Sequence, residues 1–291
     1  MSDARSLRTQ DAAETLAARL PPLLVEAYRV AATVAQGVHG RRRVGAGETF
    51  WQFRSYEAGD TVSRIDWRQS AKGGRVFVRE NEWEAAQSVW LWRDGSASMN
   101  YRSSANLPLK RERSELLLLA LAALLMRGGE HFALLGSGQT PRGGRPSLNR
   151  IAATLLDNRM PATGLPAVEP LPRYGHTVLI GDFLAPLDEI KTAIGGFASR
   201  GVKGHLVQVL DPAEEGLPFG GRISFKGFEG ESDELIPRVE TVRDAYGQRL
   251  QAQRDGLTAL ARTAGWSFTT HRTDKPPQPA LLALFAAIGG V

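Results

Sequence analysis

The chain alternates between strand-like and helix-like segments from Gln87 onward, and this alternation limits the possible folds more than any other feature. Such a rhythm is typical of a mostly parallel sheet with helices on both faces. The expected strands are Ser88–Trp92, His131–Leu135, His176–Ile180, Gly204–Leu210 and Trp266–Thr270. The expected helices are Lys110–Met126, Leu148–Leu156, Leu187–Ser199, Glu240–Ala264 and Pro279–Ala287. The predicted fold class is therefore α/β, with a doubly wound, mostly parallel sheet.

The most apolar segment, Leu116–Met126, has eleven residues. A membrane-spanning helix needs about 20, so we expect a buried helix packed against a central strand, Ser88–Trp92, and no transmembrane segment. The N-terminus lacks the apolar stretch of a secretory signal, and the chain has no cysteine. Both features favour a cytoplasmic protein.

Two smaller regions precede the α/β part. The spacing of leucines predicts a helix over Asp11–Gln36, and the following segment is rich in glycine, arginine and aromatic residues. That segment is predicted to be β-rich with one short helix, Thr61–Ala71, capped by Asp60. The expected domains are an N-terminal helical arm at 1–36, a β-rich region at 37–86 and the α/β domain at 87–291.

The distribution of charge argues against a nucleic-acid-binding protein. The net charge is +5 and Arg41-Arg42-Arg43 form a basic patch, but the other basic residues are scattered without interleaved aromatic residues. The segment 211–240 is locally acidic, with eight acids against three bases. We interpret it as a solvated loop, and a docking surface is the alternative.

One short motif carries the chemistry of the α/β part. Asp94, Ser96 and Ser98 follow the first strand, so a tight loop can turn a carboxylate and two hydroxyls toward one point. Such hard oxygen ligands suit Mg²⁺ or Mn²⁺. Asp182 follows the strand His176–Ile180 and is the natural second carboxylate, because parallel strands end at the same edge of a sheet. The alternatives are ordinary turn chemistry for the serines and a helix cap for Asp182.

Several motifs together resemble the signature of the domain of unknown function 58 family. They are Arg54-Ser-Tyr56-Glu-Ala-Gly59-Asp60, Arg64-Ile-Asp66-Trp67, Val78-Arg79-Glu80 and Asp94-Gly-Ser96-Ala-Ser98-Met99. The resemblance implies a von Willebrand factor A-like fold with a metal-ion-dependent adhesion site. It also implies a partnership with MoxR-type AAA+ ATPases, for which such proteins are thought to act as adaptors.

The sequence departs from the pattern of metal-binding A domains at two positions. Those domains supply a threonine ligand from a middle loop, and the candidate here, Thr163 in Pro161-Ala-Thr-Gly164, has surroundings that match poorly. Arg93 directly precedes Asp94, and a cation beside a metal carboxylate competes with the ion. A metal-free site is therefore the alternative.

The Arg64, Asp66 and Trp67 cluster has two interpretations. It can dock a partner, or it can anchor a small β unit through an Arg–Asp pair and a buried tryptophan.

We expect no enzyme, because the sequence contains no phosphate-binding loop, nucleophile elbow or His-x-x-x-His pair. The five histidines are isolated, and His131 and His176, which open predicted strands, are expected to be structural. The leading interpretation is a metal-dependent protein-binding module with a cytoplasmic partner. The alternatives are a metal-independent structural adaptor and, less favoured, a Mg²⁺-dependent phosphohydrolase.

Overall fold

The computed structural model describes residues 22–38, 50–56, 65–73, 75–81, 86–157, 161–227 and 232–289. The chain divides into two compact units, one made of Met1–Val38 with Ser88–Val291 and the other of His39–Gln87. The basic Arg41–Arg43, the Gly59-Asp60 turn and Arg64 lie outside the described residues, as does the first part of the expected N-terminal helix.

The larger unit is built on a parallel sheet of five strands in the order β4-β3-β5-β6-β9. These strands are β3 (Ser88–Arg93), β4 (His131–Leu134), β5 (His176–Gly181), β6 (Lys203–Leu210) and β9 (Ser267–Arg272). The predicted α/β class is confirmed, and each predicted strand is present. As expected, the first strand, β3, is an interior strand and contacts α4, although β5 is the middle strand of the sheet.

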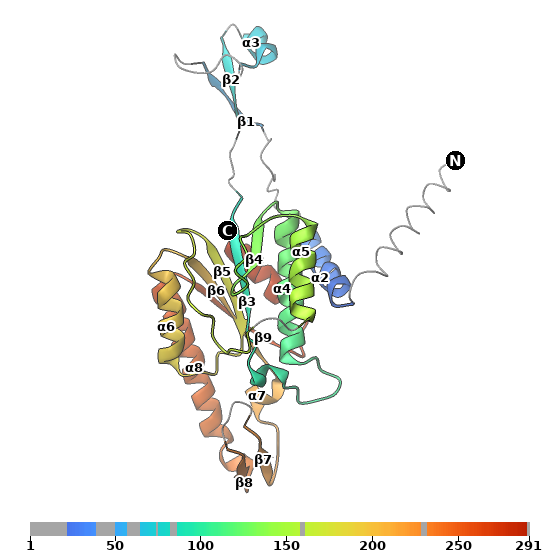
Figure 1. Ribbon diagram of the computed structural model, residues 1–291, viewed down its shortest axis with the longest axis vertical. Helices are drawn as coiled ribbons and strands as arrows, with labels where there is room; N and C mark the ends of the chain where they lie inside the picture. The colour runs from blue at the N-terminus through green and yellow to red at the C-terminus, as the bar shows by residue number, and fades with distance from the viewer. Residues whose placement is uncertain are drawn as a thin grey trace, which may run out of the picture. The chain divides into compact units, whose positions relative to one another are not determined.

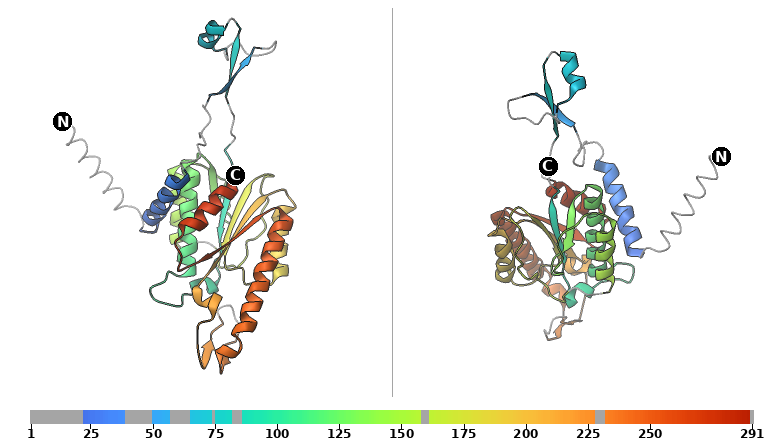
Figure 2. Two further views of the ribbon diagram at one scale, coloured as in Figure 1. Left: turned by 180° about the vertical axis from the view of Figure 1, so that it is seen from behind. Right: turned by 45° about the horizontal axis from the view of Figure 1, so that its top comes forward.

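Helices cover both faces of this sheet, as Figure 1 shows. One side carries α4 (Lys110–Arg127), α5 (Arg145–Leu156) and α2 (Pro22–Val38), and the other carries α6 (Leu187–Ala198) and α8 (Arg243–Ala264). Helix α9 (Gln278–Ile288) contacts both α2 and α4 (Figure 2). Within the described part of the chain, no helix is long and apolar enough to span a lipid bilayer.

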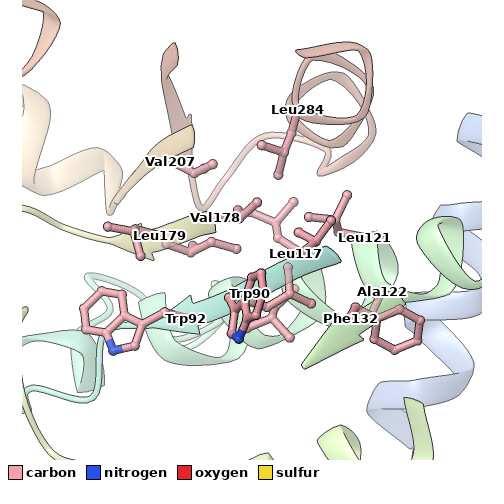
Figure 3. Packing of buried hydrophobic residues seen from close by; sticks show 14 of the residues in the cluster. Trp90, Trp92, Leu117, Leu121, Ala122, Phe132, Val178, Leu179, Val207 and Leu284 are labelled. Carbon is pink, nitrogen blue, oxygen red and sulfur yellow. The ribbon is translucent and has the colours of Figure 1, made fainter. Parts of the chain in front are cut away.

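Helix α4 forms the centre of the core. Every residue from Ser114 to Leu125 is buried, on all sides of the helix. Leu117 and Leu121 lie near Val178 of β5 and Leu284 of α9 (Figure 3). A helix that is apolar all round must be covered on every side, and here the sheet, α2, α5 and α9 provide the cover.

The described N-terminal helix differs from the arm that we expected at 1–36. Helix α2 packs on α4, and its Leu24, Ala27 and Ala31 are at most 1% exposed. Helix α2 packs there because the outer surface of α4 would otherwise expose leucine side chains to water.

The smaller unit contains an antiparallel hairpin, β1 (Phe50–Ser55) and β2 (Phe77–Asn81), and a short helix, α3 (Trp67–Gly73). The helix starts later than Thr61, and its cap is Asp66 rather than Asp60, because the Oδ1 atom of Asp66 accepts a hydrogen bond from the Gln69 N–H at 2.9 Å. Trp67 is 64% exposed, so the interpretation of a buried anchoring tryptophan was wrong.

The acidic segment 211–240 is more ordered than the solvated loop that we expected. It contains α7 (Pro212–Gly216), a small antiparallel hairpin of β7 (Ile223–Phe225) and β8 (Glu234–Ile236), and a 3-10 helix, η3 (Val239–Thr241). Residues 228–231 lie outside the described part. The start of this segment contributes directly to the candidate site.

His176 and His205 have structural surroundings. Their ring nitrogens Nδ1 and Nε2 lie 3.4 Å apart at the start of β5 and β6, and Ser267 Oγ lies 2.8 Å from the other ring nitrogen of His205. Burial, with the positive charges of nearby groups, lowers the pKa of His205 to about 4. This imidazole is therefore neutral near pH 7.

The packing of α2 on α4 gives a first testable prediction. Leu24→Ala should lower the free energy of unfolding by about 2–5 kcal/mol, because it removes a fully buried side chain and leaves a cavity. Arg29→Ala, at an exposed position of the same helix, should change it by less than about 0.5 kcal/mol. Denaturant unfolding measures both, and equal effects of the two variants would contradict the packing.

Candidate functional site

The candidate site lies at the edge of the sheet where β3 and β5 end. The chain runs from β3 outward to β4 and then back past β3 to β5, so the strand order reverses between these two neighbours. In open α/β sheets, ligands bind at the carboxyl ends of the strands at such a reversal. Asp94 and Asp182 directly follow β3 and β5, and the Asp94 N–H donates to the Ile180 carbonyl at 2.8 Å.

Two serine hydroxyls lie between the two carboxylates, and each carboxylate accepts a hydrogen bond from one of them. Asp94 Oδ1 accepts from the Ser96 N–H at 2.8 Å and from the Ser96 hydroxyl at 2.5 Å. The hydroxyls of Ser96 and Ser98 are 3.0 Å apart, and Ser98 Oγ donates to Asp182 Oδ2 at 2.6 Å. Asp94 and Asp182 are 1% and 4% exposed. The structure thus brings together four of the five predicted site residues through their side chains.

Local backbone geometry explains why these side chains converge. Ser96 is extended and precedes a single 3-10 turn, η2 (Ala97–Asn100), so the chain turns sharply after β3. Gly181 has no side chain, and a Cβ atom there would lie 2.9 Å from the Cβ of Asp94. The glycine therefore leaves the space that the Asp94 side chain occupies.

Thr163, the fifth predicted residue, reaches the site through its backbone. Its carbonyl accepts a hydrogen bond from the Gly95 N–H at 3.0 Å, and the neighbouring Gly164 lies against Ser96. The side chain of Thr163 is exposed. The middle loop therefore packs on the motif, as a ligand-bearing loop would, but no side-chain hydrogen bond links Thr163 to the other described site residues.

Sequence reasoning missed Lys110, which is completely buried beside the motif. Its ammonium donates to Asp182 Oδ2 at 3.0 Å and to Glu214 Oε1 at 2.6 Å. Burial alone would lower the pKa of Lys110, but the carboxylates of Asp182 and Glu214 outweigh it and raise the pKa above its ordinary value. A permanent positive charge therefore lies within the site.

Glu214 is held in place by the start of α7. Asp211 caps this helix by accepting from the Ala213 N–H at 2.8 Å, and Glu214 Oε2 in return accepts from the Asp211 N–H at 2.8 Å. Asp211 Oδ2 also accepts from the Ser103 N–H at 3.0 Å, which ties α7 to the segment after η2. The sequence Asp-Pro-Ala-Glu after a buried strand is a helix-start signal that could have revealed α7.

Arg93, the cation that the sequence placed beside Asp94, pairs with an acidic side chain of α4, and the charge of Asp94 also acts on it. Its guanidinium pairs with Glu115 of α4 at 3.2 Å and donates to the backbone carbonyl of Asp94 at 3.1 Å. Lys110 thus contacts the Asp182 carboxylate directly, and Arg93 supports the backbone of the motif.

The donor set fits a hard divalent cation. Two carboxylates and two hydroxyls lie within hydrogen-bond reach of one another at a sheet edge, and all are oxygen ligands of the kind that Mg²⁺ and Mn²⁺ prefer. Among the described residues, no cluster of three or more His, Cys, Asp or Glu offers another metal site. Any ion here would depend on the serine hydroxyls.

Comparison with protein families and curated proteins places the chain among proteins of unknown function. The family described as "Protein of unknown function DUF58" matches residues 52–256, as the signature residues predicted. The uncharacterized protein Rv1480 of Mycobacterium tuberculosis is 26% identical over 278 residues, which cover 89% of this chain and 86% of that protein. An uncharacterized protein of Mycobacterium bovis matches with the same values.

Two solved structures show weaker likeness. An aerotolerance-related membrane protein from Bacteroides fragilis aligns over 71% of this chain and 100% of that chain, with 15% identity and a TM-score of 0.39. The conserved hypothetical protein BatB from Bacteroides thetaiotaomicron aligns over the same shares, with 14% identity and a TM-score of 0.37. These scores are too low for any conclusion to rest on them.

The contact between Gly181 and Asp94 gives the second prediction. Gly181→Ala should lower the free energy of unfolding by about 1–3 kcal/mol, because the new methyl group overlaps the buried Asp94 side chain. Gly195→Ala within α6 is the matched control, since nothing lies within 4 Å of its Cβ position. The control should raise stability by about 0.4–1 kcal/mol. Thermal or denaturant unfolding compares them, and equal signs would contradict the close approach.

Proposed function

The chain belongs to the DUF58 family, whose function is unknown, and we propose that it is a protein-binding module rather than an enzyme. In this proposal, Asp94, Ser96, Ser98 and Asp182 hold a Mg²⁺ or Mn²⁺ ion. The ion keeps an open position for an acidic side chain of a cytoplasmic partner protein.

The convergence of Asp94, Ser96, Ser98 and Asp182 where β3 and β5 end is the observation that carries the proposal. Residues 84 positions apart meet there through the 2.6 Å bond from Ser98 to Asp182. Buried carboxylates are costly unless they are paired or bound to a cation, so an ion at this edge of the sheet would stabilise both of them. When bound, the ion would supply positive charge for a partner carboxylate, while the chain's own residues orient it.

The partner that we propose is a MoxR-type AAA+ ATPase, and its support is the signature described in the sequence analysis. Such an ATPase would place both proteins in the cytoplasm. The von Willebrand factor A-like character of the domain and its adhesion-type site belong to the same proposal, and the observed sheet and site geometry support them.

Ion binding gives the third prediction. The melting temperature of the wild-type protein should rise with millimolar Mg²⁺ or Mn²⁺, since binding to the folded state alone stabilises it by mass action. At about 100 times the dissociation constant the gain is about 2.7 kcal/mol. Asp94→Ala should abolish this gain, whereas Asp188→Ala, at an exposed position of α6, should preserve it.

Calorimetry of Mg²⁺ and Mn²⁺ binding can contradict the proposed metal-dependent mechanism. If calorimetry detects no Mg²⁺ or Mn²⁺ binding to the wild-type protein, or if Asp94→Ala binds the ion equally well, the proposed ion site is wrong.

Partner binding gives the fourth prediction. Ser98→Ala removes one oxygen and the bond to Asp182 with little change in volume. We expect it to weaken binding of the purified ATPase at least about tenfold, which corresponds to 1.4 kcal/mol, and we expect chelation of the ion to do the same. Ser199→Ala, at an exposed position after α6, is the control. Undiminished affinity for Ser98→Ala and in the presence of chelator would rule out the ion bridge but leave the adaptor function standing. If the ATPase does not bind under any condition, the proposed partner is wrong.

A metal-independent structural adaptor is the second candidate function, and the buried ammonium of Lys110 favours it. Lys110 already supplies positive charge to Asp182, so the site can remain folded without an ion. Metal dependence of partner binding separates the two candidates. A phosphohydrolase would be revealed by turnover on a panel of phosphoesters. Such an enzyme needs a second acid two residues after its nucleophilic aspartate, and Ser96 occupies that position here.

A further inference from the structure

We propose that Lys110 is a resident counter-cation that competes with a divalent ion for Asp182 and thereby sets how tightly the site holds that ion. This inference rests on the proposed ion site. It adds Lys110 of α4 to the residues that act on the site, and it predicts that the charge of this residue weakens ion binding.

The first step concerns the lone pairs of Asp182. Its Oδ2 atom accepts from both the Ser98 hydroxyl and the Lys110 ammonium, and its Oδ1 atom accepts from the Leu184 N–H at 3.3 Å. A carboxylate oxygen offers about two lone-pair positions, so Ser98 and Lys110 together occupy both positions of Oδ2. An ion that takes Oδ2 must displace one of the two donors.

The two donors differ in how easily they can yield. The Ser98 hydroxyl can rotate its hydrogen elsewhere and present its own oxygen to an ion. The Lys110 ammonium has no acceptor lone pair, and its side chain is 0% exposed at the start of α4, so it cannot withdraw into water. Lys110 therefore stays near the ion and repels it.

Glu214 determines how strongly Lys110 engages Asp182. The ammonium lies closer to Glu214, at 2.6 Å, than to Asp182, at 3.0 Å. Glu214 is fixed by its hydrogen bond to the Asp211 N–H in the cap of α7. The ammonium is thus shared, and removal of the Glu214 charge would leave it to Asp182 alone.

Substitutions of Lys110 and Glu214 should therefore have opposite effects on the affinity for Mn²⁺. Lys110→Met removes the competing positive charge and should tighten Mn²⁺ binding at least about tenfold. Glu214→Gln removes the group that draws the ammonium away from Asp182, and it should weaken Mn²⁺ binding at least about tenfold. Loss of structure alone would weaken binding in both variants, so the opposite signs identify an electrostatic role.

The experiment is isothermal titration of the full-length wild-type protein, Lys110→Met, Lys110→Arg and Glu214→Gln with MnCl₂. Circular dichroism of each variant checks that it is folded. Lys110→Arg keeps the charge and should bind Mn²⁺ close to the wild-type affinity. If Lys110→Met does not fold, the Glu214→Gln titration decides alone, and unchanged or tighter binding by that variant overturns the inference.

The remaining outcomes separate this inference from the proposed function. Mn²⁺ binding by the wild-type protein, with unchanged or uniformly weakened binding in both charge variants, overturns the role of Lys110 and leaves the ion site standing. Absence of binding in the wild-type protein and in every variant overturns both. Binding that appears only in Lys110→Met supports both, with the wild-type site held weak by its own lysine.

Discussion

Burial of a helix that is apolar on every side is the constraint on which the larger unit depends. Helix α4 is buried around its whole circumference from Ser114 to Leu125, and no single partner can cover such a surface. The sheet covers one side, and α2, α5 and α9 cover the rest. The N-terminal helix is therefore recruited into the core from a distant part of the chain, which explains why the unit is discontinuous in sequence.

The same helix connects the core to the candidate site. Packing of α4 against the sheet fixes its first residue, Lys110, at the end of β5, where the ammonium is completely buried. A buried charge is tolerated only when it is paired and hydrogen-bonded, and Asp182 and Glu214 meet that requirement. The position of Asp182 is thus coupled to core packing through α4 and to the cap of α7 through Glu214.

Sequence reasoning predicted the elements well and their long-range contacts poorly. The five strands and the five helices between or after them were predicted to within about three residues, because their periodic apolar patterns are local signals. The convergence of Asp94 and Asp182 was also accessible, since parallel strands end at one edge of a sheet. The packing of α2 could have been inferred from the all-round apolarity of α4, which requires a cover on its outer side.

The missed residues show why a motif alone describes this site incompletely. Lys110 meets Asp182 and Glu214 across 72 and 104 positions of sequence, and no local pattern encodes either contact. Arg93 is adjacent to Asp94 in sequence, yet its guanidinium is neutralised by Glu115. Adjacency alone therefore did not reveal Lys110, which reaches Asp182 from the start of α4. The electrostatics of the site are a property of the assembled fold. Lys110 at the start of α4 and Glu214 in the cap of α7 together set the charge around Asp182.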